Sequence, residues 1–573
     1  MRTVLPFILL IICFASILHG QKFPGNDTFI SPVKPPLFFA GDFGELRPSH
    51  FHSGLDFRTQ GKTGLPVYAV KDGYISRIGI SPTGYGNALY MNHPDGTTSL
   101  YGHLQRFHPE LQEYVKEKQY ERESFLVNVT LSPGEFKFKK GDIIAWSGNS
   151  GSSGGPHLHF EIRDTKSERA FNPLLYHFGI RDNSAPKIIS LYAYPLTENS
   201  NIGQNRNKKR FEAIPVPGGY RLKNNAPIEL YGKIGFGVQA EDFFSGTGLS
   251  CGIYSAILLC DGKEVFGFTM NSFSFEDVRY ANSQSDYEEY LLSHHWIQRL
   301  YRQPGNKLDI YDHEVNHGIL NLEDGKNHDL EIIVSDAFKN KANLKFRTIS
   351  KKSQLSVIKR SVTKRFLFDQ ANLFENDKIR IDIPKGALYD NLGFIWKCSP
   401  KPNGYYSELH QVQSKFIPVH KPYSLSIRSE NLPDHLKNKA LIVAIDPVKG
   451  NKTAIGGDFS GGWVIVTTNL FGNFAIAVDK TPPVVIPLSI KDKKRLTDAS
   501  KVQFKIADDL SGIKSYRGEI DGKWVLFEYD AKSGVISYTF DKQRMTFEKS
   551  HLLRLIVTDN KDNSSEYKAI IFK

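Results

Sequence analysis

The sequence predicts a mostly β protein, with an antiparallel β-sheet domain at the N-terminus and several β-sandwich domains after it. Aromatic residues make up 12% of the chain, and together with many valines, isoleucines and threonines they favour sheets over helical bundles. Short alternating runs of apolar and polar residues are separated by Gly, Pro, Asn and Asp, which are typical of tight turns. The 573 residues exceed one hydrophobic core and indicate about three or four domains.

The first 20 residues predict a cleaved export signal. Arg2 is followed by an apolar run from Val4 to Leu18, which is too short to span a membrane. Cys13 lacks the preceding small residue that a lipoprotein signal requires, so a lipid anchor is disfavoured. We therefore expect an exported protein, located in the periplasm or at the cell surface.

The net charge of the chain indicates which kinds of binding partner to expect. The formal net charge is +12, which favours an acidic polymer or surface as the neighbour of an exported protein. Lysines and arginines are spread along the chain without a motif of stacked aromatic and basic residues, so we expect no nucleic acid partner.

The most informative segment contains His157 and His159. Residues two apart on a strand point to the same face, so both imidazoles can reach one small object, which we expect to be a metal. His52, Asp56 and His103 lie upstream in two further short motifs. Two imidazoles and one carboxylate make the three-ligand set of a catalytic zinc whose fourth position holds water. The two remaining histidines are then free for proton transfer.

Three motifs occur in order: His-x-x-x-Asp, Tyr-x-His-Leu, and His-x-His after a Gly-Pro turn. In these motifs the segment from about Phe38 to Leu175 resembles the lysostaphin-type (LytM-like) zinc metalloendopeptidases, a family of peptidoglycan hydrolases. The resemblance implies a duplicated-hybrid-motif antiparallel β-sheet. Ser150 and Gly154 depart from the residues that the family often has beside its groove. The resemblance assigns the zinc ligands as His52, Asp56 and His159, and the catalytic histidines as His103 and His157.

The resemblance also implies the substrate class, which is peptidoglycan, cleaved within its stem peptides or cross-links by a zinc-activated water. A non-catalytic wall-binding or activator protein is a second interpretation, which the intact ligand set disfavours. A sugar-transport phosphocarrier is a third, and both the export signal and Asp56 argue against it. A fourth keeps the zinc in a latent protein whose groove is closed until a partner opens it.

An insert at residues 105–138 follows the second motif. Pro109 can open a helix, and Leu111, Tyr114 and Val115 follow at helical spacing. Phe125–Leu131 then predicts a strand. Because the insert departs directly after His103, we hypothesise that it borders the groove. The alternative is a peripheral, solvated insert.

The rest of the chain contains an internal repeat. An Asp-x-x-Ser-Gly segment occurs at Asp242 and again at Asp508, and an Asp-x-x-x-Asn segment occurs at Asp336 and again at Asp559. Two immunoglobulin-like sandwiches are therefore expected, with these segments as turns and calcium binding as the alternative. The C-terminal β domains could bind cell-envelope protein partners. The predicted domains are 1–20 (signal), 21–182 (peptidase), 183–349 (sandwich), 350–479 (β-rich, role unassigned) and 480–573 (sandwich).

A second metal motif is interpreted as a chance match. His313-Glu314-Val315-Asn316-His317 fits the His-Glu-x-x-His signature of zinc proteases, whose chemistry needs a helix. Gly318 follows at once and β-prone residues flank the segment, so we expect a strand there.

Overall fold

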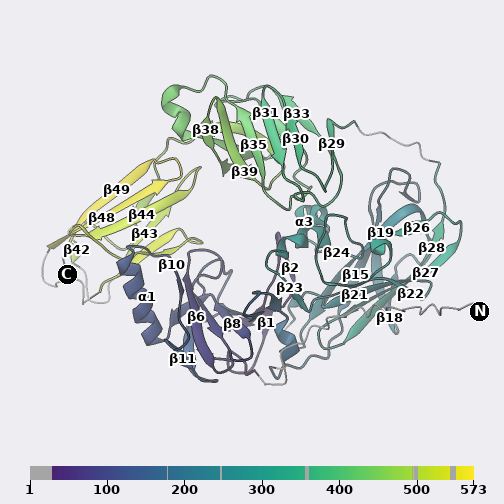
Figure 1. The fold of residues 1–573 in the computed structure, drawn as a ribbon, viewed down its shortest axis with the longest axis horizontal. Helices are drawn as coiled ribbons and strands as arrows, with labels where there is room; N and C mark the ends of the chain where they lie inside the picture. The colour runs from purple at the N-terminus through teal and green to yellow at the C-terminus, as the bar shows by residue number, and fades with distance from the viewer. Residues whose placement is uncertain are drawn as a thin grey trace, which may run out of the picture.

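The computed structural model describes residues 29–176, 178–245, 248–354, 361–492, 494–495, 501–541 and 550–572. The predicted export signal lies outside these residues. The predicted fold class is confirmed, because an antiparallel β-sheet domain at the N-terminus is followed by further β domains (Figure 1). Within the described residues, no helix has the length and apolar character needed to cross a membrane.

The first domain is built on an antiparallel sheet with a small three-stranded sheet beside it. Its apolar side chains, such as Leu55, Phe57 and Tyr101, are fully buried. The helix α1 (Pro109–Glu121) lies in the predicted insert. In pairing order the large sheet contains β1 (Phe39–Gly41), β4 (Leu55–Arg58), β13 (His157–Asp164), β8 (Thr97–Gly102), β7 (Ala88–Asn92), β6 (Gly73–Ile80) and β10 (Val127–Thr130), and the small one contains β5 (Pro66–Tyr68), β12 (Ile143–Ser147) and β9 (Leu104–Phe107).

The second domain has a long, strongly bent sheet whose strand β19 (Ile228–Phe243) pairs with several neighbours. A helical insert, with α2 (Ala281–Gln284) and α3 (Tyr287–Ser293), projects from it. The other strands of the main path are β16 (Asn201–Ile202), β15 (Lys187–Pro195), β17 (Lys209–Val216), β18 (Gly219–Leu222), β28 (Lys341–Ser350), β27 (Asn327–Ser335), β21 (Ser255–Cys260), β22 (Lys263–Thr269) and β25 (Tyr311–Glu314).

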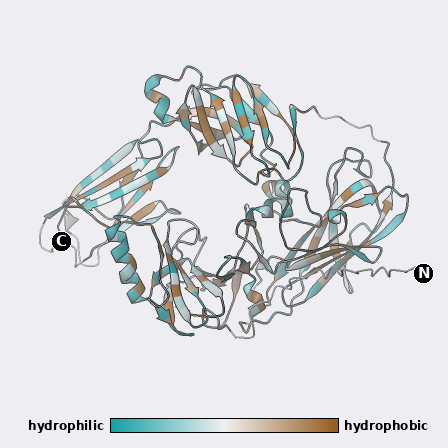
Figure 2. Ribbon diagram, in the orientation of Figure 1, coloured by the Kyte–Doolittle hydropathy of each residue, from teal (hydrophilic) through white to brown (hydrophobic). Residues whose placement is uncertain are grey.

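The last two domains each have two main sheets with an apolar core between them, and the third has in addition a small sheet of β29 (Lys364–Phe366) and β32 (Leu392–Phe394). Figure 2 shows brown segments along the strands of both domains. The third domain contains β30 (Asn372–Glu375), β31 (Ile379–Ile383), β35 (Tyr423–Arg428), β39 (Trp463–Thr468) and β38 (Asp458–Ser460), opposite β33 (Trp396–Ser399), β34 (Leu409–Val412), β40 (Gly472–Val478), β36 (Ala440–Ile445) and β37 (Lys452–Gly456). The fourth contains β41 (Val484–Pro487), β43 (Lys501–Ala507), β47 (Val535–Thr539) and β46 (Glu528–Asp530), opposite β42 (Lys494–Arg495), β49 (Ser564–Phe572), β48 (Ser550–Asp559), β44 (Ile513–Ile520) and β45 (Lys523–Trp524).

The first two domains share part of one core. The ring of Phe273, from the second domain, stacks on Phe43 with the centroids 4.5 Å apart and contacts Phe51 at 5.5 Å. Two short strands, β14 (Ala170–Phe171) and β23 (Ser272–Phe273), pair across the same boundary. The second domain therefore supports the segment that leads into His52.

Replacing Phe273 by alanine is expected to lower the free energy of unfolding by about 3–5 kcal/mol, because a fully buried ring is lost and a cavity is left. Differential scanning calorimetry should show the loss in the transition of the first two domains. The exposed Phe572 provides the matched control, since Phe572→Ala removes a ring from the surface of another domain. An unchanged transition in Phe273→Ala would show that the shared core contributes little.

The chain curves back, so that the C-terminal sandwich meets helix α1 (Figure 1). Lys116 pairs with Asp541 at 2.7 Å, and Glu123 pairs with Arg517 at 2.6 Å. The Tyr120 ring meets the edge of Trp524 at 5.1 Å. Figure 2 shows α1 as largely hydrophilic. Because the Glu123–Arg517 pair is exposed, it contributes only about 0–1 kcal/mol.

Candidate functional site

Three adjacent strands bring the predicted site residues together. In the sheet, β13 lies between β4 and β8, and the register places His159 opposite Asp56 on one side and opposite Gly102 on the other. His103 follows Gly102 directly. Leu158 and Phe160 alternate with the histidines and are fully buried on the other face of the sheet. The period-two alternation of a strand thus aims His157 and His159 at one place.

His52 reaches the same place because the turn that follows it lies directly against the backbone of β13. His52 and Asp56 are joined by a short turn through Gly54, and a β-carbon at Gly54 would lie 2.2 Å from the carbonyl oxygen of Phe160. Only glycine lets this turn lie against β13. The first motif therefore needs its glycine for packing as well as its two ligands for chemistry.

Three donor atoms converge at the centre of the site. His52 Nε2 lies 3.0 Å from Asp56 Oδ1 and 3.1 Å from His159 Nδ1, and the last two atoms are 2.9 Å apart. Four ligands around a zinc at about 2.0–2.1 Å lie about 3.3 Å from each other. The side chains of His52, Asp56 and His159 are all buried, with residue exposures of 6%, 7% and 4%.

In His52 and His159, the hydrogen bond made by the ring nitrogen that faces away from the site shows which nitrogen carries the hydrogen. His52 Nδ1 lies 2.7 Å from the carbonyl oxygen of Asp42, which can only accept, so His52 donates there and Nε2 carries a lone pair. His159 Nε2 likewise lies 2.8 Å from the Glu161 carboxylate. Once His159 has lost its second proton, two imidazole lone pairs and one carboxylate oxygen face each other, and this donor set fits a zinc ion.

The electrostatics agree with that fit. Burial alone would raise the pKa of Asp56, but the imidazoles around it hold the pKa well below its ordinary value. Burial lowers the pKa of His159, yet its hydrogen bonds to Asp56 and Glu161 outweigh burial and raise the pKa to about 9. Metal binding at this site therefore releases a proton from His159.

The two other predicted histidines lie beside the donor atoms. His157 Nε2 is 3.4 Å from Asp56 Oδ1, and the rings of His103 and His157 are 4.7 Å apart. His103 Nδ1 donates to the carbonyl of Ser150 at 2.9 Å, and His157 Nδ1 donates to the carbonyl of Gly155 at 2.8 Å. Each ring thus presents Nε2 as an acceptor toward the site.

His103 has an unusual backbone conformation and a shifted side-chain pKa. Its backbone φ is 58°, a conformation that non-glycine residues rarely adopt and that clusters at functional sites. Burial, followed by the nearby His159 and His157, lowers the pKa of His103 to about 3. The His103 ring is therefore neutral near pH 7.

Sequence reasoning missed Glu161 as a functional residue. Its carboxylate is fully buried and accepts hydrogen bonds from Ser53, Tyr85 and Arg163 at 2.6 to 2.7 Å, in addition to its contact with His159. Although burial opposes ionisation, Arg163 and His159 hold the pKa of Glu161 well below its ordinary value. The signal was present, because Glu161 continues the alternation of His157 and His159 on the same face.

Other groups that support the site could not be found from residue types. The carbonyls of Asp42 and Ser150 orient His52 and His103, and any residue can supply a carbonyl. Arg47 contacts Asp56 Oδ2 at 3.3 Å and pairs with Glu45 at 3.0 Å. It holds the carboxylate oxygen of Asp56 that does not face the two histidines.

The His-Glu-x-x-His segment lacks the geometry of a metal site. His313 and Glu314 lie on strand β25, and His317 lies in the short turn η3 (Asn316–Gly318). Glu314 pairs with Arg302 at 2.6 Å. The predicted strand is present, and the two histidines do not share a helix face as the signature requires.

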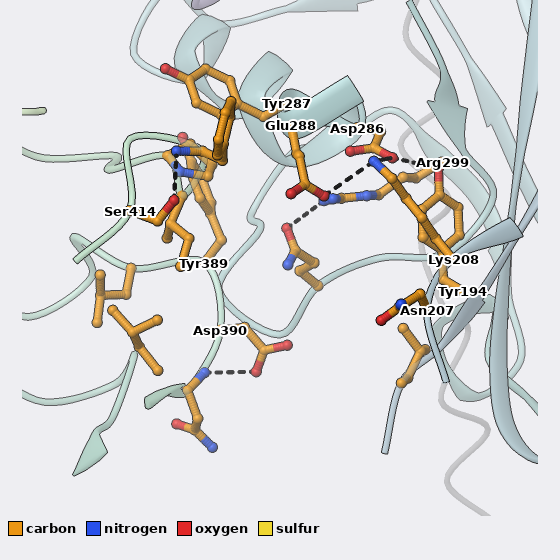
Figure 3. Close-up of a pocket in the computed structure, with 18 of the residues that line it drawn as sticks. Tyr194, Asn207, Lys208, Asp286, Tyr287, Glu288, Arg299, Tyr389, Asp390 and Ser414 are labelled. Atoms are coloured by element: carbon orange, nitrogen blue, oxygen red, sulfur yellow. Dashed lines mark hydrogen bonds and ion pairs between the residues drawn. The ribbon is translucent and has the colours of Figure 1, made fainter. Parts of the chain in front are cut away.

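A cavity of about 910 Å³ lies between the second and third domains. Figure 3 shows Lys208 reaching toward Asp286 and Glu288, at 2.9 and 3.2 Å. Arg299 donates to the carbonyl of Ser283 at 3.1 Å. These charges are paired with each other or with the backbone, so we place the functional site at the five convergent residues instead.

Two family models match parts of the chain. Residues 50–120 match peptidase family M23, and residues 363–479 match the Zu5-like domain. The first range contains His52, Asp56 and His103. The second covers most of the segment whose role the sequence left unassigned. The N-terminal domain therefore resembles M23 peptidases, and the recognition of the lysostaphin-type family from its motifs is confirmed.

Named relatives match over the same domain. The DD-carboxypeptidase/endopeptidase Mpg of Neisseria meningitidis is 33% identical over 118 residues, which are 21% of this chain and 21% of that protein. Lysostaphin of Staphylococcus simulans is 32% identical over 111 residues, 19% of this chain and 17% of that protein. The crystallised catalytic domain of the latter is 28% identical, with 24% of this chain and 87% of that chain covered and a TM-score of 0.18. The chain spans about a fifth of the length of the curated relatives it matches.

Proposed function

We propose that the chain is an exported, zinc-dependent endopeptidase that hydrolyses peptide bonds in peptidoglycan stem peptides or cross-links. One observation carries the proposal: His52, Asp56 and His159 direct three donor atoms at one point, beside two histidines that present Nε2 as an acceptor. The names of the relatives, a DD-carboxypeptidase/endopeptidase and lysostaphin, support the substrate class.

The roles in this proposal follow from the hydrogen bonds. His52, Asp56 and His159 would hold the zinc, which when bound supplies a Lewis acid that polarises the scissile carbonyl and lowers the pKa of water. His103 and His157 each keep Nδ1 on a backbone carbonyl, so each can receive a proton at Nε2 and return it to the leaving amine. The other ring could support the developing negative charge on the substrate oxygen only in its protonated form, in which Nε2 carries a hydrogen.

The test is digestion of two purified peptidoglycans, one directly cross-linked and one with glycine bridges. The zinc-loaded protein should release new amino groups from one of them, and mass spectrometry of the fragments should identify the bond. Removing the metal with a chelator should stop the release, and added zinc should restore it. Absence of cleavage in both polymers with stoichiometric zinc would overturn the proposed activity.

That negative outcome would favour a second candidate function, a latent peptidase. Lys532 of the C-terminal sandwich donates a hydrogen bond to the carbonyl of Asn149, next to the Ser150 carbonyl that holds His103. The sandwich and the insert also line a cavity of about 460 Å³ whose wall includes Asn149, Ser150 and Gly151. In a latent protein, a cell-envelope partner that binds the sandwich would release this loop.

A further inference from the structure

Three buried carboxylates lie where the peptidase domain joins the second domain. Asp182 belongs to the connecting segment, Asp242 lies near the end of β19, and Asp336 follows β27. Each offers one oxygen, and these oxygens lie within 4.8 Å of one another. The three residues are 5%, 2% and 2% exposed. Three ionised carboxylates in one buried place repel each other unless a cation neutralises them.

Turn chemistry accounts for only some of the oxygens. Asp182 Oδ1 accepts from the amides of Ser184 and Ser245 at 3.0 Å, and Asp336 Oδ1 accepts from the amide of Asn340 at 2.8 Å. However, Asp182 Oδ2 and Asp242 Oδ1 are buried without a hydrogen-bond partner in the described structure. Buried polar atoms are almost always paired, so these two oxygens point to a missing ligand.

The charge around Asp242 supports the same view. Burial, followed by repulsion from Asp336, raises the pKa of Asp242 to about 7. Asp182 also raises the pKa of Asp242 and of Asp336, so the three carboxylates repel one another.

The C-terminal sandwich repeats the arrangement at its own connecting segment. Asp479 accepts from the amide of Ser511 at 2.9 Å, as Asp182 does from Ser245. Asp508, the counterpart of Asp242, also has an Oδ1 without a partner in the described structure. There the oxygens within 4.8 Å come from Asp479, Asp508 and Asp509. The same orphaned oxygen thus occurs at the same position of both copies.

We propose that each of the two carboxylate clusters is a calcium site. The donors are all oxygens, which calcium prefers, whereas zinc favours nitrogen and sulfur. Because Asp508 is more exposed than Asp242, the site of the C-terminal sandwich is the weaker of the two.

Bound calcium would fix each sandwich to the segment that precedes it. Asp182 and Asp479 lie in the connecting segments, whereas their partners lie within the sandwiches. At the first site the effect can reach the predicted zinc ligands, because Asp242 is paired in the sheet with Cys251, and the next residue, Gly252, donates its amide to Asp42 at 2.9 Å. The carbonyl of Asp42 in turn orients His52. The ion therefore stabilises the junction behind the catalytic centre.

The experiment is a calcium titration of the zinc-loaded full chain in calcium-depleted buffer, followed by isothermal titration calorimetry. The wild type should bind two calcium ions, and its thermal unfolding temperature should rise in millimolar calcium. Asp242→Asn should weaken the tighter site by about tenfold or more, because one ligand charge is lost. Asp508→Asn should do the same to the weaker site. Asp369→Asn, at an exposed carboxylate outside both clusters, is the matched control.

The thermal unfolding temperature of Asp242→Asn gives a second test of the calcium proposal. Without calcium this variant should unfold at the wild-type temperature or above, since a neutral amide relieves the repulsion among the carboxylates. With calcium it should unfold at a lower temperature than the wild type. The proposal is overturned if the wild type binds no calcium, or if Asp242→Asn and Asp508→Asn each retain both sites. Magnesium in place of calcium should give little stabilisation, because it demands a tighter octahedral shell.

Discussion

Replacing His159 by alanine is expected to remove zinc from the protein and to abolish peptidoglycan hydrolysis. His159 supplies one of three convergent donors, and Glu161 on the same strand face is already paired with Arg163, Ser53 and Tyr85. Metal analysis of the dialysed protein should fall from one zinc per chain to nearly none. The exposed His295 is the matched control, and His295→Ala should keep both zinc and activity.

His103→Ala separates metal binding from proton transfer. Because His103 is bound to the Ser150 carbonyl and not to the donor set, this variant should keep its zinc. Its rate of hydrolysis should fall by about 10²–10⁴, the usual contribution of a positioned acid or base. Zinc retained in His159→Ala, or lost in His103→Ala, would reverse the assignment of the two residues.

Much of the fold and the candidate site could be predicted because both depend on local patterns. The alternation His157, Leu158, His159, Phe160 alone specifies which side chains face the site and which enter the core, and the structure has that arrangement. Pro109 and the spacing after it predicted a helix, which is α1. The repeated Asp-x-x-Ser-Gly segments predict two related domains, and this stays a prediction.

The remainder depends on contacts between distant segments, which no local pattern encodes. The stacking of Phe273 on Phe43 joins residues separated by most of two domains. The contact of Arg517 with Glu123 requires that the fourth domain return to the first. Sequence alone also missed the pairing that gives Glu161 its role, since an alternating acidic residue on a strand usually faces solvent. The hydrogen bonds to Asp42 and Ser150 use backbone atoms and were equally invisible.

Replacing Glu161 by glutamine is expected to weaken zinc binding by about 10–100-fold, because Glu161 orients His159 through a hydrogen bond at 2.8 Å. It should also lower the free energy of unfolding by about 3–5 kcal/mol, since the buried Arg163 guanidinium loses its charged partner. Competition with a zinc-binding dye would measure the first effect. Calorimetry of the metal-free protein would measure the second independently of zinc.

The matched control for Glu161→Gln is a substitution at another carboxylate that contacts Arg163. Arg163 also contacts Glu168 at 3.4 Å, but the Glu168 side chain is 55% exposed, so Glu168→Gln should cost about 0–1 kcal/mol and leave zinc affinity unchanged. The contrast tests burial as the cause, since both variants remove one carboxylate charge from Arg163. If the two substitutions lowered stability and zinc affinity equally, the net charge near Arg163 would be the cause. The hydrogen bond from Glu161 to His159 would then have no part in positioning His159. A loss of stability in Glu161→Gln without a loss of zinc affinity would make Glu161 a purely structural residue.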